Sequence, residues 1–153
     1  MKVYLISLGC AKNRVDSEVI IGNLVANEKV EITFDMGSAD LIIINTCAFI
    51  ESAKEEAINT IFEVLDTKKK RQKVMVCGCL ATRYKDEINE LIPEVDRFVT
   101  IKEYPKLKEI INSINEKEPT VINQYSNYKI NEISEEMPAI NYASNYISNK
   151  GSY

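Results

Sequence analysis

Three of the four cysteines in this 153-residue chain, Cys10, Cys47 and Cys79, follow runs predicted as buried strands and precede runs predicted as helices. In an open parallel α/β sheet, residues just beyond the carboxyl ends of neighbouring strands line one shared crevice. Thiols that are far apart in the sequence would therefore lie close together in the fold. Thiolates are soft ligands that suit iron–sulfur clusters, zinc or copper(I). The placement of these cysteines therefore predicts a metal-cluster site.

The elements that must position these thiols follow from the apolar periodicity, which alternates between strand-like and helix-like runs. The predicted strands cover residues 3–8, 31–34, 40–45, 74–77 and 97–100. The first predicted helix buries Val15, Val19, Ile20, Leu24 and Val25, and the last has Pro105 in its first turn. This alternation predicts an α/β fold with a doubly wound, mostly parallel five-stranded sheet, flavodoxin-like order 2-1-3-4-5 and helices on both faces. In that order the three cysteine-bearing strands are adjacent, at a spacing of about 4.8 Å.

Other interpretations of the cysteines stay open from the residues alone. Each could be a small buried apolar residue, or part of a structural zinc or simple interaction domain. Cys77 lies inside a predicted strand and is predicted to be a core residue. The segment from Cys77 to Arg83 also fits the C-x5-R pattern of cysteine phosphatases, in which a loop between strand and helix binds phosphate and the arginine clamps it. That interpretation leaves Cys10 and Cys47 unexplained.

Composition narrows the classes of function. The chain has no histidine, which excludes Ser/His and Cys/His catalysis and zinc sites that need imidazole. The formal net charge is −4, so no direct nucleic-acid binding is expected. No run resembles a signal peptide or reaches membrane-spanning length. We therefore expect a cytoplasmic protein without a membrane partner, where thiols stay reduced.

Three ordered motifs resemble the opening domain of the radical-SAM methylthiotransferase family. They are SLGCAKNRVDSE at residues 7–18, ADLIIINTCAFIESAKEE at residues 39–56, and GCLA at residues 78–81. The residues of the first two motifs are similar to those of the RimO-like branch, whose members methylthiolate an aspartate of the small-subunit ribosomal protein numbered twelve. The transfer-RNA branches usually differ at the first motif, but the same domain of a tRNA methylthiotransferase stays an alternative.

The resemblance implies that Cys10, Cys47 and Cys79 hold one auxiliary 4Fe-4S cluster, whose open iron carries the sulfur or methylthio group to be transferred. Asn13, Asn45, Thr46 and Glu51 flank these cysteines and are candidates to support the ligands. Gly9 and Gly78 would let the backbone approach the cluster closely. The resemblance covers residues 1–115, and residues 116–153 are expected to be a linker or a poorly ordered tail.

The chain departs from the family in one large respect. The complete enzymes carry a Cys-x-x-x-Cys-x-x-Cys triplet on a second domain, which binds a catalytic 4Fe-4S cluster and S-adenosylmethionine. All four cysteines of this chain are already placed, so that triplet is not among its 153 residues. We therefore expect either a fragment of a longer enzyme or a truncated gene product, with the radical-SAM domain and a ribosomal protein as its partners. No catalytic residue is predicted in this chain, and alone it should be inactive.

Overall fold

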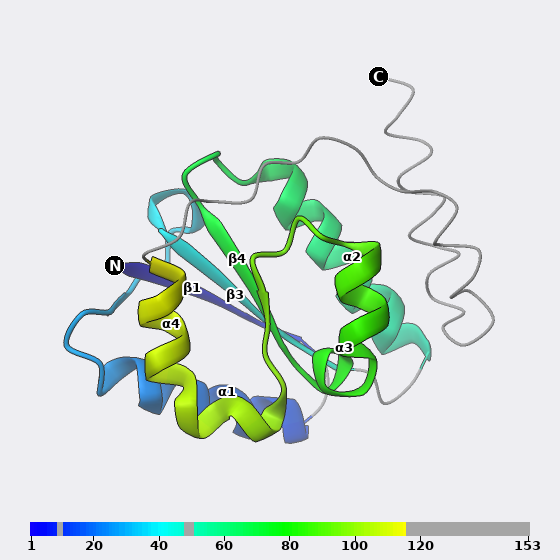
Figure 1. The fold of residues 1–153 in the computed structure, drawn as a ribbon, viewed down its shortest axis with the longest axis horizontal. Coiled ribbons are helices and arrows are strands. Elements are labelled where there is room, and N and C mark those ends of the chain that lie inside the picture. Colours follow the sequence, from blue (N-terminus) through cyan, green and yellow to red (C-terminus); the bar gives the residue numbers. More distant parts are fainter. Residues whose placement is uncertain (9–10, 48–50, 116–153) are drawn as a thin grey trace.

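The computed structural model describes residues 1–8, 11–47 and 51–115, and within them a single parallel sheet (Figure 1). Its strands are β1 (Lys2–Ser7), β2 (Glu31–Ile32), β3 (Leu41–Thr46), β4 (Lys73–Gly78) and β5 (Arg97–Phe98). Their order is β2-β1-β3-β4-β5, and every pair is parallel. The predicted α/β fold and strand order are confirmed. The predicted tail lies outside the described residues.

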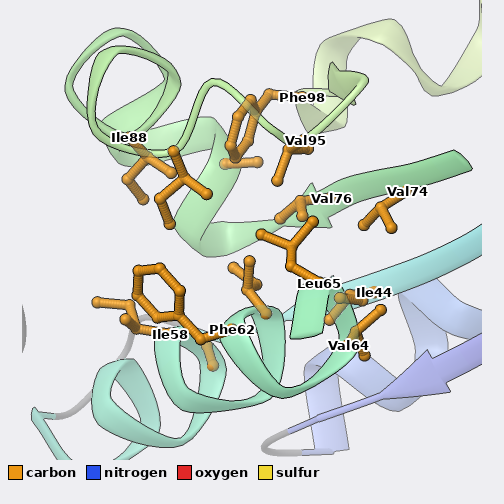
Figure 2. Packing of buried hydrophobic residues seen from close by; sticks show 14 of the residues in the cluster. Ile44, Ile58, Phe62, Val64, Leu65, Val74, Val76, Ile88, Val95 and Phe98 are labelled. Atoms are coloured by element: carbon orange, nitrogen blue, oxygen red, sulfur yellow. The ribbon is translucent and has the colours of Figure 1, made fainter. Parts of the chain in front are cut away.

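Helices cover both faces of this sheet, which is why its central strands are mostly apolar. The helices are α1 (Ala11–Val25), α2 (Glu51–Thr67), α3 (Cys79–Leu91) and α4 (Leu107–Asn115), with short 3-10 turns η1 (Met36–Ser38) and η2 (Ile101–Lys106). One core cluster joins the strands to α2 and α3, and a second joins them to α1 and α4. In the first cluster, Phe62 of α2 and Ile88 of α3 pack over Val76 of β4 (Figure 2). All six residues of β3 and of β4 are buried.

Two details of the helices differ from the sequence expectation. In α1, Ile20 and Leu24 are buried as predicted, but Val19 and Val25 are 47% and 70% exposed. The buried face of α1 is completed instead by Ser17, which is 5% exposed. Pro105 does not open the last helix, because Thr100 and Glu103 form a capping box that starts η2 ahead of it. None of the helices within the described ranges is long and apolar enough to cross a membrane.

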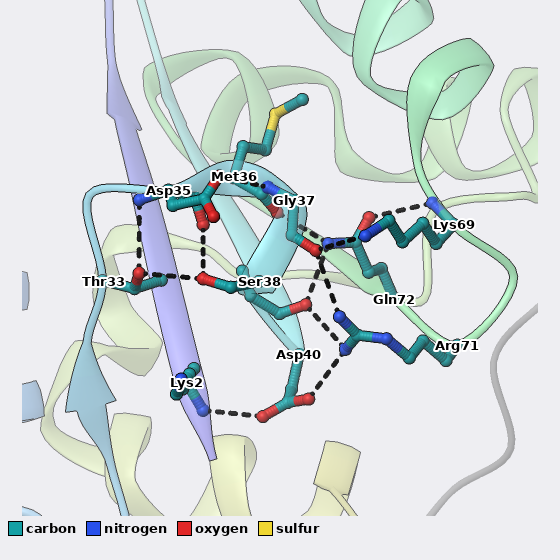
Figure 3. A network of polar contacts seen from close by, with 11 residues as sticks. Lys2, Thr33, Asp35, Met36, Gly37, Ser38, Asp40, Lys69, Arg71 and Gln72 are labelled. Carbon is teal, nitrogen blue, oxygen red and sulfur yellow. Dashed lines mark hydrogen bonds and ion pairs between the residues drawn. The ribbon is translucent and has the colours of Figure 1, made fainter.

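At the amino edge of the sheet, the loop between α2 and β4 is bonded to η1 (Figure 3). The buried Gln72 amide donates to the carbonyl oxygens of Met36 at 2.7 Å and Ala39 at 2.9 Å, and accepts from the backbone N–H of Lys69. Arg71 donates to the same turn and pairs with Asp40 at 2.9 Å. Lys69 and Arg71 therefore join two loops.

At the carboxyl edge, β3 and β4 approach each other so closely that Gly78 cannot carry a side chain. Gly78 has φ = 92°, in the region that L-residues rarely adopt. A Cβ placed there would overlap the carbonyl oxygen of Thr46 and lie 2.5 Å from Oδ1 of Asn45. The glycine was expected to make room for a cluster; among the described residues it makes room for the neighbouring strand.

We expect Gln72→Ala to lower the free energy of unfolding by about 3 kcal/mol, because it removes three hydrogen bonds of a buried side-chain amide. Urea denaturation followed by circular dichroism would measure it. Lys69→Ala is the matched control, since it removes one exposed hydrogen bond of the same network and should cost about 0.5 kcal/mol or less. Equal losses in the two variants would contradict this assignment.

We expect Gly78→Ala to destabilise the fold by about 2–5 kcal/mol, because it combines an unfavourable φ with an overlap against backbone. Gly22→Ala is the control, because a Cβ at this helical, exposed position meets nothing within 4 Å. That change should stabilise by about 0.5–1 kcal/mol. The same urea titrations compare both variants, and a neutral Gly78→Ala would show that the strand ends can separate without cost.

Candidate functional site

The predicted site lies at the carboxyl edge of the sheet, where β1, β3 and β4 end at the same level. The register pairs Ser7 with Asn45 and Asn45 with Cys77, and the N–H of Leu8 donates to the carbonyl of Asn45 at 3.0 Å. Cys47 and Cys79 come directly after the paired residues Thr46 and Gly78. The structure therefore places the positions of these two cysteines at neighbouring strand ends. Cys10, two residues beyond Leu8, lies outside the described residues.

The two described cysteines of the trio differ in their surroundings. Cys47 is buried, at 2% exposure, whereas Cys79 is partly exposed and packs at the margin of the core formed with α2 and α3. Cys79 is also the first residue of α3, so backbone N–H groups of the first helical turn lie at this edge. Helix N-termini favour negative charge, which suits thiolates and inorganic sulfide.

A chain of side-chain hydrogen bonds, buried at Asn45 and Ser17, lies directly beneath this edge on the side of α1. The Asn45 amide is 0% exposed, and its Nδ2 donates to Oγ of Ser17 at 2.7 Å. Ser17 Oγ in turn donates to Oγ of Ser7, also at 2.7 Å. The Thr46 hydroxyl donates to the carbonyl of Cys77 at 2.6 Å. Asn45 and Thr46, predicted from their positions to support the ligands, both make buried contacts. The side chains of Asn13 and Glu51, the other two candidates, are not among those that the structure describes.

Ser7 and Ser17 were not identified from the sequence, although each left a signal there. Ser7 is the polar last residue of an apolar strand. Ser17 shares a helical face with Ile20 and Leu24, at the spacing i, i+3, i+7. A polar residue on an otherwise buried stripe needs a partner, and that partner cannot be named without the fold.

Cys77 is a core residue, as predicted. Its side chain is 0% exposed within the cluster facing α1 and α4, and its thiol donates weakly to the carbonyl of Ile44 at 3.7 Å. Burial raises the pKa of the Cys77 thiol to about 12. Arg83 lies on α3, with its guanidinium 5.5 Å from the ring centre of Tyr84. A protonated thiol without solvent access cannot act as a nucleophile, so the phosphatase interpretation is wrong.

Tyr104 from η2 packs against the same thiol. Its hydroxyl faces Cys77 and the backbone of Gly78, and its pKa is raised, first by burial and then by the proximity of Cys77. Within the described part of the chain, this hydroxyl and Oδ2 of Asp16 are buried without a hydrogen-bond partner. The interior beneath Gly78 is therefore polar but uncharged at the sulfur and phenol positions near neutral pH.

The chemistry of these donors fits an iron–sulfur cluster. Two thiols stand at adjacent strand ends, and the amide and hydroxyl groups beneath them carry no charge. No group of three Cys, Asp or Glu side chains within residues 1–8, 11–47 and 51–115 could hold a metal ion. The third predicted donor, Cys10, is outside those ranges, so the trio itself stays a prediction.

Comparison with known proteins places the chain in a family. The sequence profile described as "Uncharacterized protein family UPF0004" matches residues 2–100. A protein of Clostridium kluyveri named "Ribosomal protein uS12 methylthiotransferase RimO" is 51% identical over 136 residues, which is 86% of this chain and 30% of that protein. Proteins of the same name from Acetivibrio thermocellus and Sulfurovum sp. are 49% and 48% identical, over 80% and 73% of this chain and 29% and 25% of their own lengths.

The chain therefore spans less than a third of the length of these relatives. The matched region contains all three motifs that carried the resemblance, and the fold has the predicted strand order. The chain belongs to the UPF0004 family and corresponds to the amino-terminal domain of RimO-like methylthiotransferases.

Proposed function

We propose that this chain is the auxiliary-cluster domain of an enzyme that methylthiolates an aspartate of ribosomal protein uS12, with Cys10, Cys47 and Cys79 as ligands of one 4Fe-4S cluster. The observation that supports it most directly is the register, which brings the strand ends preceding these three cysteines to one edge of the sheet. The names of three relatives support uS12 as the substrate, because each is named as a methylthiotransferase of ribosomal protein uS12.

In this proposal the chain contributes binding and orientation. Cys10, Cys47 and Cys79 would hold the cluster as thiolates, and the cluster would supply the sulfur for transfer when it is bound. Cys47 is fixed by the end of β3, and Cys79 by the turn at Gly78 and the first turn of α3. Cys77 takes no part, because its side chain is 0% exposed in the core that faces α1 and α4.

Catalysis would need groups that these 153 residues do not include. The chain has no second set of cysteines for the cluster that binds S-adenosylmethionine. We propose that this cluster, the S-adenosylmethionine and the catalytic residues belong to a radical-SAM domain of the same enzyme, which acts in the cytoplasm together with this domain. Alone, the chain should bind a cluster and methylthiolate nothing.

Anaerobic reconstitution of the chain with iron and sulfide tests the ligand set. We expect about four irons per chain and the broad visible absorption of a 4Fe-4S cluster. Replacing Cys10, Cys47 or Cys79 by alanine should lower the iron content well below that value. Cys77→Ala is the matched control, because it removes the one cysteine assigned to the core, and it should retain the iron.

Three results would contradict the proposal. Full iron content in any of the three ligand variants would remove that cysteine from the site. Stoichiometric zinc in freshly purified protein would favour a structural zinc domain. Hydrolysis of an aryl phosphate that Cys77→Ser abolishes would restore the phosphatase interpretation, against the burial of that thiol.

A further inference from the structure

Asn45 is linked to each of the described elements that flank the predicted thiol site. Through Nδ2 it bonds to Ser17 on α1, and through Ser17 it reaches Ser7 at the end of β1. The backbone carbonyl of the same residue accepts the N–H of Leu8. Its Oδ1 fills the space that Gly78 leaves open on β4 and lies 4.0 Å from Sγ of Cys77. Asn45 therefore links three strand ends and a helix, through its side-chain amide, its backbone carbonyl and the hydroxyl of Ser17.

The contacts of Asn45 flank each of the three cysteines in the sequence. Asn45 itself precedes Cys47 by two residues, and Gly78 directly precedes Cys79. The segment that contains Cys10 runs from Leu8 to the start of α1 at Ala11. Its two flanks, the end of β1 and α1, are both hydrogen-bonded to Asn45 or to its partner Ser17.

Strand packing alone does not require polar residues at this level. Residue 43 of the same strand, two positions earlier on the same face, is an isoleucine in the core cluster that also holds Met75 and Leu24. Replacing an apolar side chain with a buried amide is costly unless its hydrogen bonds are satisfied, and a satisfied buried network fixes one geometry. The chain accepts this cost in the layer directly beneath the cysteines, as it does for the buried amide of Gln72 at the opposite edge.

We propose that Asn45 is the positioning residue of the thiol site, and that it sets the separation of the strand ends that precede the cysteines through Ser17, Ser7 and Gly78. This inference rests on the proposed function, since it assumes that the three thiols share one ligand. Asn45 does not touch the reacting group in this proposal. It acts by holding the strand ends and α1 in one arrangement, which lowers the cost of ordering the thiols when they bind.

The test uses arsenite, a probe that needs neither iron nor sulfide. Arsenous acid condenses with three thiols, forming three As–S bonds and releasing three waters without any change in oxidation state. Tight binding therefore requires three thiols within reach of one atom. We expect the intact chain, reduced and kept anaerobic, to bind about one arsenic with an As–S charge-transfer band in the ultraviolet, because soft thiolates suit such a centre.

Two variants break the network at single atoms. Ser17→Ala removes the hydroxyl that links Asn45 to Ser7, and Asn45→Asp keeps the size of the side chain but removes the donor Nδ2. Each should weaken arsenite binding about tenfold, the equivalent of roughly one buried hydrogen bond. After reconstitution with iron and sulfide, each should also change the electron paramagnetic resonance spectrum of the reduced cluster.

Gln72→Ala is the matched control, because it breaks a buried amide network at the opposite edge of the sheet. It should lower stability and leave arsenite affinity and the spectrum unchanged. Wild-type affinity and spectrum in both network variants, or equal weakening by Gln72→Ala, would overturn the assignment of Asn45. An intact chain that takes up four irons while the network variants behave like it would overturn this inference alone. An intact chain that binds neither arsenite nor iron would overturn the proposed function as well.

Discussion

The parallel register of β1, β3 and β4 is the constraint on which the rest of this structure depends. Because the three strands run in one direction and are paired without offset, all three end at the same edge of the sheet. The helices that return the chain must then cover both faces, which buries all of β3 and β4. Residues separated by tens of positions in the sequence are thereby placed at one rim.

Backbone pairing by itself would not hold the strand ends at this edge together, because the backbone hydrogen bonds between strands stop at the last paired residues. The chain closes both ends of the sheet with a buried side-chain amide. Gln72 donates to backbone carbonyls of η1 and its C-cap at the amino edge, and Asn45 donates to the Ser17 hydroxyl, which in turn donates to Ser7, at the carboxyl edge. The two differ in what they hold: Gln72 joins two loops, whereas Asn45 joins the elements that precede or follow the cysteines.

The strand order could be predicted because it follows from local patterns, namely apolar runs of strand length separated by helical periods. The core position of Cys77 could be predicted for the same reason, since it lies within its run. The buried face of α1 could not, because hydrophobicity alone ranks Val19 and Val25 above Ser17. What buries Ser17 is a hydrogen bond to Asn45, a residue 28 positions away. The same holds for Tyr104, whose neighbour Cys77 belongs to another element.

Cys77 and Cys79 show how strongly the fold decides what a thiol can do. They are two residues apart, on either side of a glycine that turns the chain from strand to helix. Strand pairing directs Cys77 into the core, where burial raises the pKa of its thiol to about 12 and keeps it protonated. Cys79 starts α3 and stays partly exposed. For Cys77 to act as a ligand, β4 would have to slip relative to β3, and the close contact of Gly78 with Asn45 and Thr46 opposes that slip. The turn at Gly78 that places Cys79 at the carboxyl edge of the sheet therefore also keeps Cys77 out of the predicted thiol site.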